Sequence, residues 1–243
     1  MKKNFIQRHM IWASLIVICF MIVPWINDSY CLEKEDKTIA VKAMQETPVE
    51  EKMKVVIDPG HGGYDEGSSS NDGSIIEKNL TLKLSKKVGS ILEKNDIEVI
   101  YTRTDDNVTW SDDNIEDLLT RSEITNKSEA DCFVSIHLNY SEVEQEEIKG
   151  HEIWVNYEDD DNVALAQDIH EEMNKLSESV DRGIKDQAMS PLSLLVYNQI
   201  PSVLVETGFL SNESDAAYVN SEEGSDAVSK AIADGIMKYL TEK

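Results

Sequence analysis

The stretch KVVIDPGHGGYDEGSSS, Lys54–Ser70, places a lone histidine in a sharp break after an apolar run. Three β-forming residues lead directly into Asp58-Pro59-Gly60, and His61 then stands between glycines. Glycine permits positive φ angles and allows other groups to approach the backbone closely. The break is therefore either a tight turn with an incidental histidine or a turn that presents His61 to a ligand. The rest of the chain must decide between the two.

Short apolar runs alternate with helical patterns after residue 52. Apolar residues recur at helical spacing between residues 80 and 91, 165 and 176, and 228 and 240. This alternation predicts a single α/β domain, with a mostly parallel sheet of about six strands covered by helices. The expected strands are Lys54–Ile57, Glu98–Thr102, Cys132–His137, His151–Asn156, Ser193–Tyr197 and Ser202–Glu206.

The N-terminal part of the chain has a different composition. Residues 1–32 contain a basic leader and 17 uncharged residues, Met10–Ile26, a length between that of a signal-peptide core and that of a short membrane span. No small-x-small cleavage site follows, so we favour an uncleaved anchor over a cleaved signal, with the body of the chain outside the membrane. Residues 33–52 are charged and aperiodic and are interpreted as a linker, which leaves 53–243 as the folded domain.

The formal net charge of the 243 residues is −24. This acidic balance argues against nucleic acid and against an anionic membrane surface as partners. The N-terminal segment is then the only expected contact with a membrane. The spacing of the three cysteines does not resemble a disulfide framework, although Cys31 and Cys132 could form one bridge. Cys132, at the start of an expected strand, is expected to pack in the core.

Two histidines and two glutamates fall at the ends of expected elements. His137 and Glu206 each end a strand, and Glu77 precedes a helix. Because sites gather at the carboxyl ends of parallel strands, these groups and His61 are expected near one another. Two histidines and two glutamates are the residue types of a mononuclear zinc hydrolase site, in which three groups bind the metal and a fourth acts as general base. Taken alone, however, a glutamate at the start of a helix does not indicate a metal site, because it ordinarily interacts favourably with the helix dipole.

Six segments, in order, resemble the zinc-dependent N-acetylmuramoyl-L-alanine amidases of bacterial cell walls: VVIDPGHGG, EKNLTLKL, VIYTRTDD, FVSIHLN, VDRGIK and PSVLVETGFLSN. The resemblance covers essentially all of 53–243. It implies one zinc ion (Zn2+) per domain, bound by His61, Glu77 and His137, and it implies that Glu206 is the catalytic base. The implied reaction is hydrolysis of the amide between the lactyl group of N-acetylmuramic acid and L-alanine of the peptidoglycan stem peptide.

Four further residues are weaker candidates. Asp58 is expected in an Asx-type turn, with orientation of a ligand histidine as the alternative. Arg103 and Arg121 are candidates to meet a substrate carboxylate, or else to pair with local acids. Asn139 lies two residues past His137 and is expected to line the substrate site.

The two histidines His151 and His170 stay outside this constellation. They fall in an expected strand and an expected helix. Both are expected to be ordinary surface residues.

Three alternatives to a self-sufficient amidase remain open. The metal set alone also permits a zinc peptidase acting on the stem peptide, although the family motifs argue against it. A catalytically inactive wall-binding module is a second alternative, which the presence of all four key side chains disfavours. The third is an amidase that needs a regulatory protein partner, since the sequence has no recognisable wall-binding repeat. The expected localisation is extracytoplasmic, either membrane-anchored or secreted to the cell wall, with peptidoglycan as the substrate.

Overall fold

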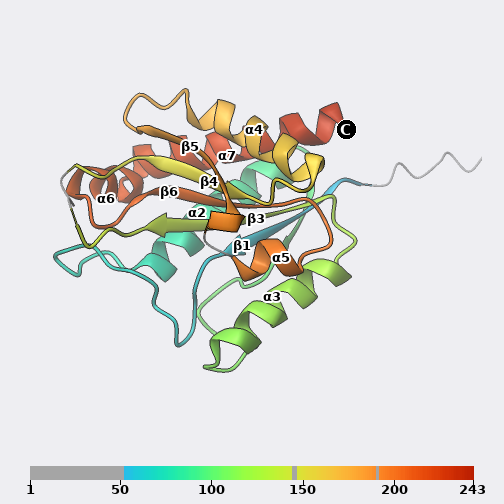
Figure 1. The fold of residues 1–243 in the computed structure, drawn as a ribbon, viewed down its shortest axis with the longest axis horizontal. Coiled ribbons are helices and arrows are strands. Elements are labelled where there is room, and N and C mark those ends of the chain that lie inside the picture. Colours follow the sequence, from blue (N-terminus) through green and yellow to red (C-terminus); the bar gives the residue numbers. More distant parts are fainter. Residues whose placement is uncertain (1–51, 144–146, 190–191) are drawn as a thin grey trace, which may run out of the picture. The chain divides into compact units, whose positions relative to one another are not determined.

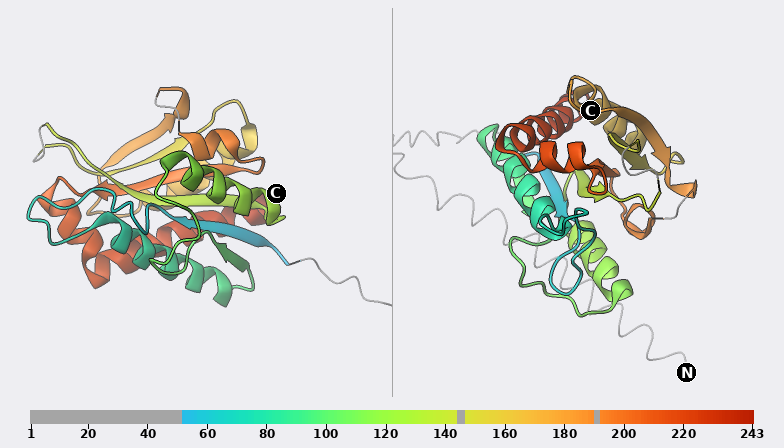
Figure 2. Two further views of the ribbon diagram at one scale, coloured as in Figure 1. Left: turned by 90° about the horizontal axis from the view of Figure 1, so that it is seen from below. Right: turned by 90° about the vertical axis from the view of Figure 1, so that its left-hand side faces the viewer.

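Six strands form one sheet in the order β2-β1-β3-β6-β4-β5, with helices on both of its faces (Figures 1 and 2). The computed structural model describes residues 52–143, 147–189 and 192–243. The expected single α/β domain is confirmed. The strands are β1 (Lys54–Pro59), β2 (Glu98–Tyr101), β3 (Cys132–Asn139), β4 (His151–Val155), β5 (Asp181–Asp186) and β6 (Ser202–Phe209). The helices are α2 (Glu77–Lys94), α3 (Asn114–Lys127), α4 (Asp160–Met173), the 3-10 turn η1 (Gln187–Met189), α5 (Ser193–Tyr197), α6 (Glu213–Asn220) and α7 (Glu222–Glu242).

The sheet is mostly parallel, as expected. Strands β2, β1, β3 and β6 run in one direction, β4 pairs antiparallel with β6, and β5 runs parallel to β4. The carboxyl ends of β1, β3 and β6 therefore lie at the same edge as the start of β4. In register along this edge, His137 of β3 is opposite Glu206 of β6, and Glu206 is opposite Glu152 of β4.

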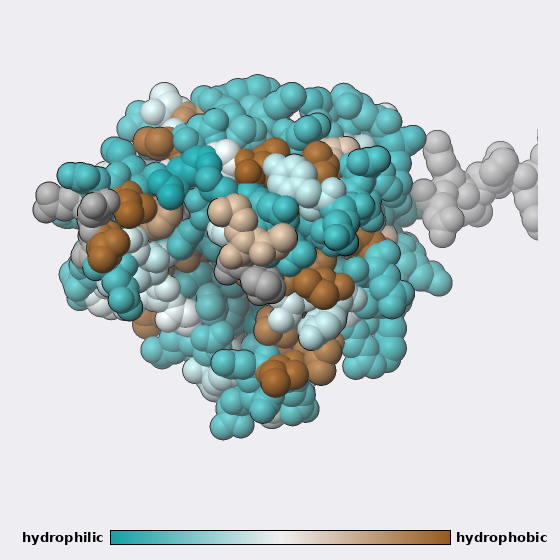
Figure 3. All heavy atoms as spheres, in the orientation of Figure 1, coloured by the Kyte–Doolittle hydropathy of each residue, from teal (hydrophilic) through white to brown (hydrophobic). Residues whose placement is uncertain are grey.

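The two faces of the sheet are covered unequally. Alternate strand residues point to opposite faces, so Val55 joins a large core under α2, α4 and α7, whereas Val56 joins a small core under α3 and α5. The helical spacing in the sequence correctly predicts the helices of the large core, and Cys132 is buried there as expected. On the α3 and α5 face, apolar surface is interspersed with hydrophilic residues (Figure 3).

One expected strand is wrong and one strand was not expected. Ser193–Tyr197 forms α5, in which the adjacent Leu194 and Leu195 are buried and the next two residues are exposed. An apolar run this short fits a helix and a strand equally well by its periodicity. In place of this expected strand, the sheet contains the edge strand β5. Its sequence DRGIKD has a single apolar residue, Ile184, and therefore no alternating pattern.

The expected membrane segment and nearly all of the expected linker lie outside the described residues. Among the residues that are described, no helix combines the length and the apolar character needed to cross a membrane.

Candidate metal centre and active site

The turn after β1 holds His61 in a left-handed backbone conformation, with φ of 60°. This conformation costs roughly 1–2 kcal/mol for a residue with a side chain, so its surroundings must impose it. The neighbouring glycines supply space. A Cβ atom on Gly60 would lie 2.3 Å from the ring of His137, and one on Gly67 would lie 2.6 Å from the ring of His61. The glycines thus allow the two imidazoles to pack beside the backbone of this loop.

Two buried arginines hold the turn by its backbone carbonyls. Arg121 donates to the oxygens of Pro59 at 3.0 Å and His61 at 2.7 Å. Arg103 donates to the oxygens of Pro59 at 3.0 Å and Gly60 at 2.9 Å. Both guanidinium groups are buried against the protein, and Arg121 pairs with the acids Asp58 and Asp117, as the expected alternative has it. The contact of either arginine with a substrate carboxylate stays a prediction.

Asp58 supports this arrangement from the core. Its fully buried carboxylate accepts hydrogen bonds from Arg121 at 2.8 Å, from Ser135 at 2.7 Å and from Thr102. These partners replace both the expected Asx-type turn and the expected contact with a ligand histidine. Burial alone would raise the pKa of Asp58, but the Arg121 charge and the two hydroxyl groups outweigh it and lower the pKa below 3.8.

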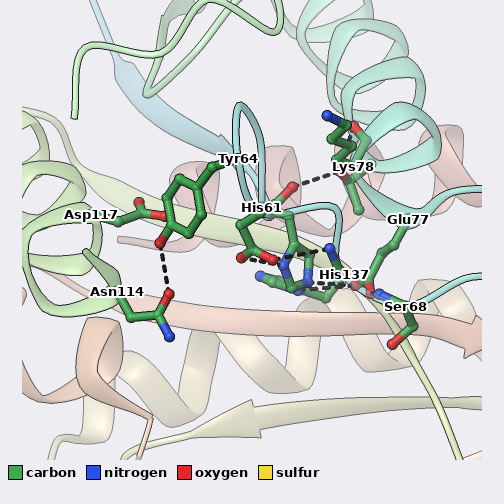
Figure 4. Close-up of polar contacts among 12 residues, drawn as sticks. His61, Tyr64, Ser68, Glu77, Lys78, Asn114, Asp117 and His137 are labelled. Carbon is green, nitrogen blue, oxygen red and sulfur yellow. Dashed lines mark hydrogen bonds and ion pairs between the residues drawn. The ribbon is translucent and has the colours of Figure 1, made fainter. Parts of the chain in front are cut away.

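Three side chains meet at the carboxyl edge of the sheet, as the sequence predicts for His61, Glu77 and His137 (Figure 4). Oε1 of Glu77 lies 3.0 Å from Nε2 of His61 and 3.2 Å from Nδ1 of His137. The two imidazole rings stand edge to face, with centroids 4.8 Å apart. One donor atom from each residue lies within 4.8 Å of the other two. The arrangement can hold a single metal ion.

Glu77 is fixed at the N-terminus of α2, where a carboxylate interacts favourably with the helix dipole. Its Oε2 accepts the backbone N–H of Ser68 at 2.7 Å, and its Oε1 accepts that of Leu138 at 3.0 Å. Burial opposes ionisation, but hydrogen bonds and charge interactions with His137 and His61 hold the pKa of Glu77 far below its usual range. Glu77 is therefore a carboxylate at neutral pH.

Asp65 completes the surroundings of His61 and is not among the residues predicted from the sequence. Its Oδ2 lies 2.7 Å from Nδ1 of His61, and its Oδ1 accepts the backbone N–H of Gly67 at 3.0 Å. Metal-binding histidines commonly donate their second ring N–H to such a carboxylate, which fixes the ring orientation. The signal in the sequence is an acid four residues after the histidine, across the glycine pair.

Glu206 stands one strand away from His137, in register with it. Its Oε2 is buried, and no hydrogen-bond donor within the described part of the chain reaches it. Burial raises the pKa of Glu206 well above 4.5; the negative charges of Glu77 and Glu152 raise it further, and His61 opposes them only in part. The direction of this shift, which the sequence left open, is therefore upward in the protein alone.

Glu152 lies beside Glu206 and is bound by Arg182. Glu152 is opposite Glu206 in the antiparallel pair, and its two oxygens accept Asn139 at 2.8 Å and Arg182 at 3.0 Å. Arg182 also stacks over the ring of Phe209, 4.9 Å from its centroid. Asn139 thus borders the Glu206 region through Glu152, and its contact with substrate stays a prediction.

Two properties of the three-residue site test whether it suits a metal ion. Two imidazole nitrogens and one carboxylate oxygen are the donors that zinc takes when a position is left for water. The site is also anionic: burial lowers the pKa of His61, but the hydrogen bonds to Asp65 and Glu77 outweigh it and raise the pKa to about 10. A cation, either a proton or a metal, is therefore favoured between these carboxylates, and the residues fit the metal.

An α/β sheet that gathers this donor set beside a separate carboxylate, whose Oε2 has no donor among the described residues, matches the class of mononuclear metal-dependent hydrolases. The sequence profile of the N-acetylmuramoyl-L-alanine amidase family matches residues 55–238. The chain therefore belongs to this family and is an enzyme that cleaves the amide between N-acetylmuramic acid and L-alanine in peptidoglycan.

Individual relatives agree with the family match. The germination-specific N-acetylmuramoyl-L-alanine amidase of Bacillus subtilis is 32% identical over 196 residues, which are 78% of this chain and 80% of the relative. The solved CwlD amidase of Clostridioides difficile, in complex with the GerS lipoprotein, is 34% identical with a TM-score of 0.73, over 79% of this chain and 100% of that one. The amidase AmiC2 of Nostoc punctiforme is 32% identical with a TM-score of 0.69, over 78% and 98%.

Proposed function

We propose that this amidase holds one zinc ion between His61, Glu77 and His137 and uses Glu206 as its general base. Bound there, zinc would polarise the scissile carbonyl and lower the pKa of a water molecule. The observation that carries the proposal is the isolation of Glu206. Its buried Oε2 has no donor among the described residues, yet the residue lies in register with His137. A structural carboxylate is ordinarily paired when it is buried.

Glu206 transfers one proton in each direction during the reaction. It accepts a proton from the attacking water, whose oxygen bonds to the lactyl carbonyl carbon. It then returns the proton to the nitrogen of L-alanine as the C–N bond breaks. The products are a lactyl carboxyl group on the glycan, which keeps the second proton of the water until it ionises in solution, and a free amino group on the stem peptide. Burial raises the pKa of Glu206 in the protein alone, whereas a bound zinc ion would lower it. A general base works best when its pKa lies near the operating pH.

Asp65, Arg121 and Arg103 orient the site without touching the reacting atoms. Asp65 fixes the ring of His61, and the two arginines fix its backbone. Because these three residues hold His61 in place, it needs little reorganisation when the metal binds, and this favours the affinity for the metal.

The proposed location is outside the membrane, because peptidoglycan lies there. Residues 1–32 would anchor or export the chain, with 33–52 as linker to the zinc amidase domain at 53–243. A lipoprotein is the partner class suggested by the Clostridioides difficile relative, which was solved with one. Protease digestion of intact cells tests the location: degradation of this domain without lysis supports it, and protection contradicts it.

The reaction is tested by mass spectrometry of muropeptides treated with the full-length chain in mild detergent. A new free amino group on L-alanine, with intact stem peptides, is the expected product. Shortened stems with intact lactyl amides would instead identify a zinc peptidase. Unchanged muropeptides with the zinc-loaded chain, but cleavage after a membrane extract is added, would identify dependence on a partner.

A further inference from the structure

A second group of possible metal ligands lies on the other side of β4 from the active site. It combines His151 at the start of β4, His170 near the end of α4 and Asp181 at the start of β5. One donor atom from each lies within 4.8 Å of the other two. Nε2 of His170 is 2.8 Å from Oδ1 of Asp181, and the imidazole centroids are 6.1 Å apart.

His151 is not the surface residue that the sequence suggested, because it is completely buried. Its Nδ1 lies 2.8 Å from the hydroxyl of Ser179, and its Nε2 lies 3.1 Å from the amide oxygen of Asn174. A hydroxyl or carbonyl partner on one ring nitrogen is the usual device that orients a metal-binding imidazole by its other nitrogen. Ser179 occupies that place here. The Nε2 atom is left in contact with the amide oxygen of Asn174.

Asn174 brings a fourth group to the same point. Its amide oxygen faces His151, and its amide nitrogen lies 3.4 and 3.2 Å from the two ring nitrogens of His170. One N–H group cannot bond well to both nitrogens of one ring. A cation bound between His151 and the amide oxygen would replace their present contact of 3.1 Å, while no well-formed hydrogen bond to His170 would be lost.

We propose that His151, His170 and Asp181 form a second binding site for a divalent transition metal such as Zn2+, with the amide oxygen of Asn174 as the fourth ligand. Two imidazole nitrogens and two oxygens match the four-coordinate preference of zinc. This site is independent of the proposed catalytic metal, because the two sites share no ligand.

The surroundings of the site include one acidic side chain beside the two imidazoles. Oδ1 of Asp181 lies 2.8 Å from Nε2 of His170 and accepts the backbone N–H of Gly183 at 2.7 Å, so the carboxylate is held next to the histidines. Half of the Asp181 side chain is exposed, which gives a metal ion a route into the site.

Such a metal would fasten the edge strand β5. This strand pairs only with β4 in the sheet order, and its residues are exposed or half-buried. Arg182, next to Asp181, binds Glu152 beside Glu206. We therefore expect the second metal to stabilise the fold at the edge that supports the Glu206 region, with its main effect on melting temperature.

The test uses the full-length chain in mild detergent, with His137→Ala as the background, because this change removes a ligand from the proposed catalytic site alone. After loading with Zn2+ and dialysis against a weak chelator, His137→Ala is expected to retain one zinc per chain. His137→Ala/His170→Ala/Asp181→Asn is expected to retain none. At a zinc concentration about 100 times Kd, the melting temperature of the first protein should rise by about 5–10 °C and that of the second should not change.

A matched control is His137→Ala/Glu178→Gln, which removes an exposed carboxylate three residues before Asp181. It should keep the zinc and the thermal shift, because Glu178 is not among the proposed ligands. His170 and Asp181 are partly exposed, so their replacement leaves the core intact, and circular dichroism checks the fold. Zinc retained equally by the three-residue variant, or absent from His137→Ala, overturns the proposal whether or not the catalytic assignment holds.

Discussion

The guanidinium of Arg121 donates a hydrogen bond of 2.7 Å to the backbone carbonyl of His61. It thereby ties helix α3 to the residue whose imidazole enters the metal site. The same guanidinium is paired with the buried carboxylates of Asp58 and Asp117. The left-handed conformation of His61 is thus held by a charged group that is itself fixed in the core. This link explains how a strained turn remains in place before any metal binds.

Arg121→Ala is expected to lower the free energy of unfolding by about 3–5 kcal/mol, because it leaves two buried carboxylates without their partner. Urea unfolding measures the loss. Lys127→Ala, which removes an exposed ion pair with Glu123 on the same helix, should change the free energy by about 0.5 kcal/mol or less. Equal losses in the two variants would show that the buried network does not hold the turn.

Asp58 makes stability depend on acid pH. Its pKa in the folded protein is lowered, below the unfolded value of about 3.9. Ionised Asp58 therefore stabilises the fold above that value, and this stability is lost as the pH falls through the folded pKa. Between about pH 5 and pH 3, the wild type should lose more stability than Asp58→Asn, which has no carboxyl to protonate. Thermal melts across this range provide the test, and parallel curves for the two proteins would contradict it.

The sequence predicts the proposed metal ligands better than it predicts what supports them. His61, Glu77 and His137 each stand at the end of an element, where a polar group interrupts an apolar pattern. The partners of Arg121 are different in kind, because one is a backbone carbonyl and another is Asp58, 63 residues away along the chain. Neither contact has a periodicity or a local motif, and both depend on where α3 packs.

The same reasoning explains the errors in the fold. Strands buried on both faces, such as β3, contain continuous apolar runs and are readily predicted. Strand β5 lies at an edge, where few of its side chains need to be apolar, so the pattern is missing. The burial of His151 follows from the pairing of β4 with β5. It could not be predicted without that strand.

Asp65→Asn is expected to weaken zinc binding by about 10–100-fold, the usual effect of removing a hydrogen-bonded partner of a ligand histidine. Asparagine retains an acceptor for Nδ1 of His61 but lacks the negative charge. Competition with a chromogenic chelator measures the affinity. Glu66→Gln is the matched control, because this exposed neighbour carries the same charge and has no side-chain contact with His61 among the described residues. If both variants bind zinc as the wild type does, Asp65 does not tune the site.

Glu206→Gln separates a general base from a metal ligand. Glutamine keeps the size of the side chain and one acceptor oxygen but cannot accept the proton of the attacking water. We expect turnover of muropeptides to fall by about 10²–10⁴-fold, the range for a positioned general base. Zinc content should remain that of the wild type, because Glu206 is not one of the three grouped donors. The melting temperature should not fall, because glutamine has no charge to bury. The control Glu213→Gln changes an exposed glutamate at the start of α6 and should retain full turnover.

Loss of zinc from Glu206→Gln would instead make the residue a fourth ligand. Normal turnover with zinc retained would show that another group accepts the proton, since the buried Oε2 would then have no part in the reaction.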